Sequence, residues 1–253
     1  ILEFFKSVDY EPKKIIRITK NITGVFAVNR LIHQLTSEYF AIVNNDIIVT
    51  KNWLKNLITC MDSDPKIGAA CPVSTNISNN QLEVLEGFSD LEEMQKKAAR
   101  FNKSDKRKWE ERLRIIPTAM LFRREMLDDI GVFDVGFVHD FGDDDFFFRA
   151  RRAGYQLIVC RDTFVHHDHN MMERDISGLE MKRSQMGREA FQKKYQGLDA
   201  WEDGANHIKE FCHYGELDYE KEKQIQILGV DTRCGTPILD VKNKLKAEGY
   251  FDF

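Results

Sequence analysis

Two nearly continuous apolar segments, joined by an amphipathic helix, constrain the fold of this chain more than any other feature. The segments are YFAIV at residues 39–43 and IGAACPV at residues 67–73. Such runs, without polar alternation, are typical of strands that are buried on both faces of a parallel sheet. Between them, Trp53, Leu57 and Met61 recur at helical spacing. Strand, helix and strand over this length predict right-handed βαβ units, and so an α/β fold with a mostly parallel sheet flanked by helices.

Composition narrows the class of protein. The chain has 253 residues, of which 42% are hydrophobic and 31% charged, so it can bury the core of one large domain. Its net charge of −4 gives no reason to expect nucleic acid as a partner. The five cysteines form no C-x-x-C pair, which favours free thiols in a reducing cytoplasm. No apolar run reaches the roughly 18 residues of a membrane-spanning helix. We therefore expect a cytoplasmic protein, for which peripheral association with a membrane stays open.

Patterning along the chain predicts three parts. Residues 1–175 form the main α/β domain, residues 176–224 a helical extension, and residues 225–253 a βα unit or the stub of a second domain. Residues 82–114 form a charge-rich and mostly helical insertion, whose basic centre we interpret as a solvated helix face. A contact with a phosphate-bearing acceptor or a lipid headgroup is the alternative for that centre. Near the start, KIIRIT at residues 14–19 predicts a short strand.

An acidic and histidine-rich stretch at residues 137–170 carries the candidate chemistry. It contains three adjacent carboxylates, a strand-like YQLIVC and a histidine cluster: Asp143, Asp144, Asp145, His166, His167 and His169. Adjacent carboxylates repel each other unless a cation or backbone N–H groups offset their charge, and a helix that begins at about Asp145 would supply such groups. A helix cap with solvated loop acids is the simpler alternative. The histidines one strand away favour a divalent-metal or acid–base site.

Three segments of the chain resemble one protein family. They are VNNDIIVTKNWL (43–54), IGVFDVGFVHDFGDDDFFFRARRAGY (130–155) and RDTFVHH (161–167). In order, spacing and flanking residues they are similar to the family-two glycosyltransferases, which have the GT-A fold. The resemblance covers residues 14–170. Members of that family open with a strand, a helix and a second strand that ends in V-D-x-x-S-x-D, so we expect this domain to be N-terminally incomplete.

The resemblance implies a metal site. In the family, an Asp-x-Asp-like motif after a strand binds a divalent metal on the nucleotide-sugar diphosphate. Its counterpart here is Asn44-Asn45-Asp46, with Asn in place of the first Asp. This follows the first buried strand at its carboxyl end, where open α/β sheets place their ligand-binding groups. The resemblance makes Asp46 a metal ligand and places Asn45 beside the substrate. The late histidine that completes the site corresponds to His167, with His166 as the neighbouring candidate. The implied metal is Mn²⁺ or Mg²⁺.

The resemblance also implies a catalytic base and a nucleotide pocket. Counting back from the R-x-R-R-A-G-Y motif places the family's base on Asp143, with Asp144 as the alternative and Asp145 as a substrate contact. The family's N-x-x-G…A-x-N run, which lines the nucleotide pocket, has its counterparts in Asn21, Gly24, Ala27 and Asn29.

The activity implied is transfer of a sugar, with inversion, from a UDP- or GDP-linked donor to a hydroxyl of a glycan or lipid-linked acceptor. Its setting would be the synthesis of cell-surface polysaccharide or glycan. Two alternatives stay open. The first is a degenerate GT-A domain that acts as a sugar-binding or scaffolding module, which the Asn at position 44 favours. The second is phosphoester hydrolysis by two metals bound between the acid trio and the histidine cluster.

Overall fold

The structure, a computed structural model, describes residues 2–9, 15–20, 22–85, 87–137, 140–168, 178–195, 197 and 200. The predicted βα unit at residues 225–253 lies outside this part of the chain, as does most of the predicted extension at residues 176–224. The division into three parts therefore stays a prediction. Of the extension, the expected helix is present as α7 (Gly178–Lys194).

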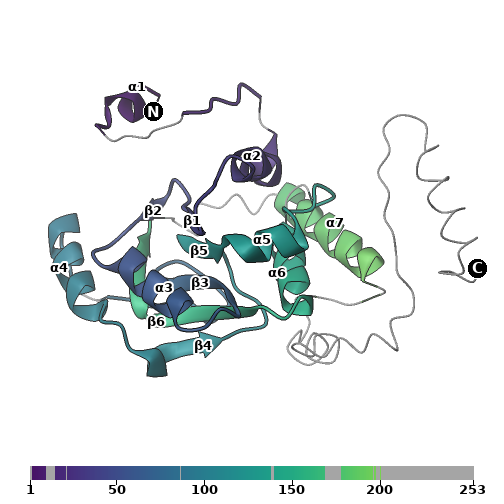
Figure 1. Cartoon of the computed structure of the whole chain (residues 1–253). Helices are drawn as coiled ribbons and strands as arrows, with labels where there is room; N and C mark the ends of the chain where they lie inside the picture. The colour runs from purple at the N-terminus through teal and green to yellow at the C-terminus, as the bar shows by residue number, and fades with distance from the viewer. Residues whose placement is uncertain are drawn as a thin grey trace, which may run out of the picture. The chain divides into compact units, whose positions relative to one another are not determined.

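Six strands form one sheet (Figure 1). They are β1 (Tyr39–Ile42), β2 (Ile47–Ile48), β3 (Ile67–Ser74), β4 (Trp109–Glu111), β5 (Met120–Arg123) and β6 (Gln156–His167). The order is β1-β5-β3-β6-β2, and β4 pairs with β6 outside that path. Together with the helices that pack on it, this sheet confirms the predicted α/β class.

The prediction of a mostly parallel sheet is wrong. Among the strands just named, only β3 and β6 pair in parallel, and the other four pairings are antiparallel. β1 and β3 do share one direction, as the βαβ pattern requires, but β5 lies between them and runs the opposite way. The apolar pattern could not show this, because a strand buried on both faces has the same composition whichever way its neighbours run.

Helices pack on both faces of the sheet. The helices in the described ranges are α1 (Leu2–Ser7), α2 (Thr23–Ile32), α3 (Trp53–Asp62), α4 (Leu91–Phe101), α5 (Arg124–Ile130), α6 (Gly142–Arg152) and α7. On one face, Leu57, Cys60 and Met61 of α3 pack against Ala70 of β3 and Leu121 of β5. The next residues along these strands point to the other face and meet α5 and α6. Alternate side chains of each strand therefore serve two separate cores. None of the helices in the described ranges is both long enough and apolar enough to cross a bilayer.

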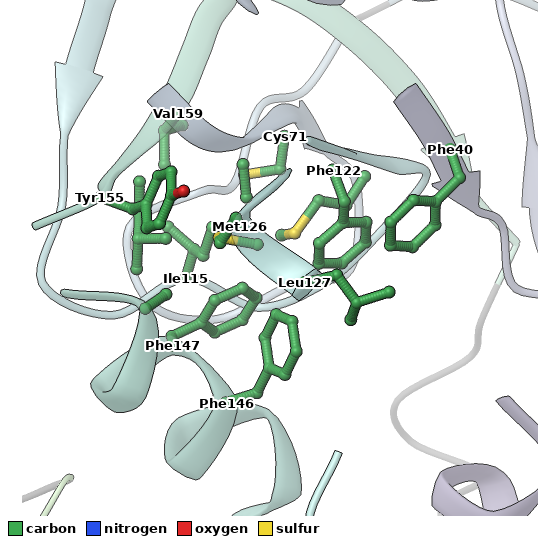
Figure 2. Close-up of a cluster of buried hydrophobic side chains, with 14 of the residues drawn as sticks. Phe40, Cys71, Ile115, Phe122, Met126, Leu127, Phe146, Phe147, Tyr155 and Val159 are labelled. Atoms are coloured by element: carbon green, nitrogen blue, oxygen red, sulfur yellow. The ribbon is translucent and has the colours of Figure 1, made fainter. Parts of the chain in front are cut away.

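Phenylalanine side chains fix α6 on the sheet (Figure 2). The ring of Phe122 on β5 stacks on Phe40 of β1, with centroids 5.1 Å apart. Phe146 and Phe147 of α6 reach the same ring from the helix side, at 5.9 and 6.4 Å. At its start α6 passes close to α2, since a Cβ on Gly142 would lie 3.1 Å from a methyl group of Val25. These contacts set the position of the acidic first turn of α6.

The predicted insertion at residues 82–114 is helical only in part. It contains α4 and a 3₁₀ turn at Lys106–Lys108, but it ends in β4, which pairs with β6. The buried carboxylate of Asp162 ties this segment to β6, because it accepts hydrogen bonds from the indole of Trp109 (2.8 Å) and the backbone of Asp105 (2.6 Å). Residues 15–20, the described part of the KIIRIT segment and its end, are not in a strand, which corrects that expectation.

Candidate active site

The structure brings together the two residues predicted to bind metal. Asp46 immediately precedes β2, which pairs in antiparallel fashion with the end of β6, Ile47 opposite His167. The backbone N–H of Asp168 donates to the carbonyl of Asp46 (2.8 Å). As a result, Nε2 of His167 lies 3.3 Å from Oδ2 of Asp46, with both side chains partly exposed. A carboxylate and an imidazole therefore face each other at the carboxyl ends of β1 and β6.

The neighbouring candidate, His166, has other partners. Its Nδ1 lies 3.2 Å from the hydroxyl of Thr75, and its ring packs edge-on against Phe88, with centroids 5.9 Å apart. Successive residues of a strand point to opposite faces, so His166 and His167 do not share one site. Of the two histidines left open by the resemblance, the geometry favours His167.

The polar contacts of His167 fit a bound cation. Its Nδ1 lies 3.2 Å from the carbonyl oxygen of Asn76, an acceptor, so this nitrogen carries a proton. In the neutral ring Nε2 is then a lone pair that points at a carboxylate oxygen. A carboxylate oxygen and an imidazole nitrogen at this distance can bind the same cation; the oxygen suits Mn²⁺ or Mg²⁺, and the nitrogen favours Mn²⁺ of the two.

The described part of the chain contains no larger cluster of metal ligands. Within the described ranges, no three His, Cys, Asp or Glu side chains are grouped so as to hold a metal ion. The two-metal hydrolase alternative is therefore not supported by any residue in those ranges; His169 lies outside them. A metal held by Asp46 and His167 would take its other ligands from substrate phosphates and water, as Mg²⁺ commonly does.

The three aspartates of the acidic motif all lie in the first turn of α6, which begins at Gly142 and not at the predicted Asp145. Asp143 is partly exposed. Burial of its carboxyl group and the charge of Asp144 raise its pKa to about 7, although Arg114 and backbone N–H groups oppose this shift. A carboxyl group with a pKa near 7 can accept a proton at neutral pH. Asp143 therefore has the property that a general base needs.

The other two aspartates have structural partners. Asp144 is buried and forms an ion pair with Arg114. Asp145 is completely buried. Its carboxylate accepts from three donors: Arg149 (2.9 Å), Tyr195 (2.7 Å) and Lys194 (2.5 Å). Two of these donors belong to the end of α7 and the residue after it. Asp145 thus joins α6 to α7, and its predicted contact with substrate stays a prediction.

Of the other residues predicted to contact the nucleotide or substrate, one is buried with structural partners and two are exposed. The amide of Asn29 is buried, donates to the backbone carbonyl of Phe133 (2.7 Å) and accepts from its N–H (3.0 Å). It joins α2 to the segment before α6, and its predicted role as a substrate contact stays a prediction. Gly24, in the first turn of α2, and Asn45 are exposed and stay candidates. Asn21 lies outside the described residues.

One loop connects the metal-site candidates with the acids of α6. The loop follows β3 and comprises residues 75–81. At one end Thr75 and Asn76 contact His167. Further along, the side chain of Asn79 donates to the carbonyl of Arg114 (2.8 Å), whose guanidinium holds Asp144. The prediction from sequence missed Arg114, Thr75 and Asn76. The asparagine-rich STNISNN segment was the available signal, since asparagine is one of the few residues that readily adopt left-handed backbone turns.

Comparison with known proteins identifies the family. The family model described as glycosyl transferase family 2 matches residues 1–131. No curated protein matches the chain.

Two solved structures resemble the chain with a TM-score of 0.51 each. The mannosyltransferase PcManGT from Pyrobaculum calidifontis, in complex with GDP-Man and Mn²⁺, is 15% identical, over 94% of this chain and 64% of that one. GalNAc-T7, with UDP, GalNAc and Mn²⁺, is 12% identical, over 82% of this chain and 45% of that one. This chain thus spans less than two thirds of either protein.

At such identities the likeness shows the fold, which is GT-A. The family model covers more than half of the chain, and the chain belongs to glycosyl transferase family 2.

Proposed function

We propose that this chain transfers a sugar from a nucleoside-diphosphate donor to an acceptor hydroxyl with the help of a divalent metal. The observation that carries the proposal is the pair formed by Asp46 and His167, 3.3 Å apart at the ends of β1 and β6. Family membership and the GT-A fold support it. Further support comes from the donors and Mn²⁺ in the two similar structures, GDP-Man in one and UDP in the other.

In this proposal Asp46 and His167 hold the metal. A bound Mn²⁺ or Mg²⁺ supplies positive charge that stabilises the departing diphosphate. The carboxylate of Asp46 contributes a negative oxygen ligand, and the backbone contacts of β2 with β6 keep it opposite His167. The exposed Asn45 and Gly24 stay candidates for contacts with the donor.

Asp143 is the proposed base. Its carboxylate would take the proton of the acceptor hydroxyl as that hydroxyl attacks the anomeric carbon. A single carboxylate that assists direct attack leads to inversion, by the reasoning that distinguishes inverting from retaining glycosidases. Asp144 suits this role less well, because it is 5% exposed and one of its oxygens is occupied by Arg114.

Calorimetric titration of UDP and GDP with and without Mn²⁺ tests the donor site. We expect Mn²⁺-dependent binding of one nucleotide, weakened about 10-fold or more in Asp46→Asn and His167→Ala, because each variant removes a ligand that the metal needs. His33→Ala is the matched control, since His33 is an exposed histidine at the end of α2. If the protein binds neither nucleotide with Mn²⁺, the result would support the scaffolding alternative. The sequence feature that favours this alternative is Asn44, which replaces the first Asp of the family's motif.

For the acceptor, we propose a lipid-linked glycan at an anionic membrane surface, as in the synthesis of cell-surface polysaccharide or glycan. The support is a set of exposed basic residues on α4, the 3₁₀ turn and the loop between them, which we name the basic surface: Arg100, Lys103, Lys106 and Lys108. The side chain of Gln95 on α4 bonds to the backbone of Val49 and Lys51, just after the Asp46 segment. α4, which carries Arg100, is thus bonded to the chain just after the proposed metal ligand Asp46.

Co-sedimentation with vesicles tests this proposal. Each basic side chain near an anionic surface contributes about 1 kcal/mol, so Lys103→Glu with Lys106→Glu should weaken binding to phosphatidylserine vesicles by more than 10-fold. Lys66→Glu is the control, because it reverses the charge of an exposed lysine just before β3, outside the basic surface. It should have little effect on vesicle binding. Equal binding to phosphatidylcholine vesicles, or no loss in the double variant, would contradict the proposal.

A further inference from the structure

The two residues that follow β3, Thr75 and Asn76, both contact His167. β3 and β6 pair in parallel up to Ser74 and Val165, and the strand pairing ends there. Beyond that point, the backbone of His167 forms hydrogen bonds with the side chains of Thr75 and Asn76. The backbone N–H of His167 donates to the Thr75 hydroxyl (2.9 Å), and the side-chain amide of Asn76 donates to the His167 carbonyl (3.0 Å).

The Thr75 hydroxyl has a complete set of partners. A hydroxyl group can donate one hydrogen bond and accept two. It donates to the carbonyl of His167 (3.1 Å) and accepts from the N–H of the same residue. Its second lone pair then faces Nδ1 of His166 at 3.2 Å, which places a proton on that nitrogen. This one side chain therefore fixes the backbone of His167 and the orientation of the preceding ring.

Asn76 acts on the ring of His167 itself. Its backbone is in the left-handed region, with φ of 50°, which asparagine tolerates better than most residues. The carbonyl of this residue lies 3.2 Å from Nδ1 of His167. A carbonyl oxygen can only accept, so it selects the form of the ring that has its proton on Nδ1. The opposite nitrogen, Nε2, is left as a lone pair facing Asp46.

We propose that Thr75 and Asn76 form a clamp that sets both the orientation and the proton position of His167, and so presents Nε2 as a ligand before any metal arrives. Both are positioning residues, because they act through His167. The inference rests on the proposed function, because it assumes that His167 binds a metal. The position of the proton on the ring of His167 can nevertheless be measured without metal or substrate. Residues that orient a ligating histidine in this way typically change metal affinity about 10–100-fold when they are removed.

Nitrogen chemical shifts of the histidine rings test the clamp in the metal-free protein. The spectra would be recorded over a series of pH values, so that the neutral form of each ring is identified from its own signals. A His167→Gln variant assigns the signals of His167 among the seven histidines. We expect the proton of His167 on Nδ1 in the native protein, a mixture of both ring forms in Thr75→Val, and a return to Nδ1 in Thr75→Ser, which keeps the hydroxyl.

Binding of Mn²⁺ alone, followed by electron paramagnetic resonance, is the second measurement. We expect Thr75→Val to weaken it about 10–100-fold and Thr75→Ser to restore it to near the native value. The matched control is Thr59→Val, because Thr59 is an exposed residue on α3 whose hydroxyl bonds within its own helix, to the carbonyl of Lys55. If Thr75→Val does not fold, Asn76→Gly keeps the left-handed backbone and the carbonyl that faces Nδ1 but removes the side-chain bond to the His167 carbonyl. Mn²⁺ binding should weaken in this variant while the proton stays on Nδ1, and unchanged binding would contradict the clamp.

A proton on Nε2 of His167 in the native protein would overturn the proposal, and so would a Thr75→Val variant with unchanged ring form and Mn²⁺ affinity. Failure of the proposed function looks different. In that case the ring would respond to Thr75 as expected, but neither nucleotide would bind with Mn²⁺. The two ideas can therefore fail separately.

Discussion

Three neighbouring aspartates on α6 have different surroundings, and the surroundings decide what each can do. Burial and a neighbouring charge leave Asp143 with a pKa of about 7, whereas Asp145 is enclosed by donors. We expect Asp143→Asn to bind Mn²⁺ and nucleotide normally but to transfer sugar about 10²–10⁴-fold more slowly, the usual contribution of a general base. Transfer assays with the native protein should also show activity falling below pH 7. Asp128→Asn, on the exposed face of α5, is the control. Near-native turnover in Asp143→Asn would contradict the assignment.

The same residue should carry a cost in stability. An ordinary aspartate has a pKa of about 3.9 when unfolded, and Asp143 has one of about 7 in the fold. Between these values the unfolded chain has released its proton while the folded chain retains it, so rising pH destabilises the fold. Asp143→Asn should therefore raise the melting temperature at pH 8 but not at pH 4, as measured by circular dichroism. An equal effect at both pH values would show that burial does not penalise the charge.

Asp145 should show the opposite behaviour. Removal of one partner from a buried and hydrogen-bonded ion pair typically costs about 3–5 kcal/mol. Asp145→Asn leaves the cations of Arg149 and Lys194 without their shared carboxylate, so we expect a loss of this order in urea unfolding, at neutral pH. Separation of α7 from α6 should accompany it. A variant as stable as the native protein would mean that α7 does not depend on this contact.

At the level of elements, α5 lies so close to β3 at Gly68 that a larger residue there should not fit. A Cβ at this position would lie 2.4 Å from the sulfur of Met126 and 2.9 Å from Cβ of Tyr155. Overpacking of this kind costs about 1–3 kcal/mol, so Gly68→Ala should unfold at lower urea concentration than the native protein. Gly24→Ala is the matched control: no atom lies within 4 Å of its Cβ position, and alanine in a helix should stabilise it by about 0.4–1 kcal/mol. The same sign for both variants would refute the packing argument.

The elements also show what a sequence pattern can and cannot predict. α3 and β3 follow from apolar spacing, and glycines with positive φ, Gly131 and Gly154, stand just after α5 and α6. β2 and β4 could not be predicted from the sequence, because segments of two and three residues are too short to show an alternation of apolar and polar side chains. The direction of β5 depends on which neighbours it meets, and that is a property of the sheet as a whole.

At the scale of the whole molecule, the site depends on contacts between distant parts of the chain. The family model ends at residue 131, before α6 and β6, so Asp143 and His167 lie beyond the matched region. The resemblance of short motifs nevertheless predicted Asp46 and His167 together, and they meet. It did not predict the buried roles of Asn29 and Asp145, because burial is decided by what packs on a side chain and not by its place in a motif.

Binding of donor should therefore protect several separate segments at once. If Mn²⁺ and a nucleotide bind at the Asp46–His167 pair, hydrogen exchange should slow at residues 43–48, in the loop at residues 75–81 and at the end of β6. These segments are linked by the β2–β6 pairing and by the contacts of Thr75 and Asn76. Peptides from α3 should exchange unchanged.

An alternative location for the nucleotide makes this experiment decisive. A hollow of about 350 Å³ lies at the starts of β3 and β6, lined by Lys66, Glu125 and Tyr155 among others. This is the opposite end of both strands from Ser74 and His167. A nucleotide bound there would protect residues 65–67 and 153–156 and would not require Mn²⁺. Because Asp46→Asn removes only the proposed metal ligand, it should abolish protection at residues 43–48 and 75–81, and protection that persists in this variant would place the donor elsewhere on the molecule.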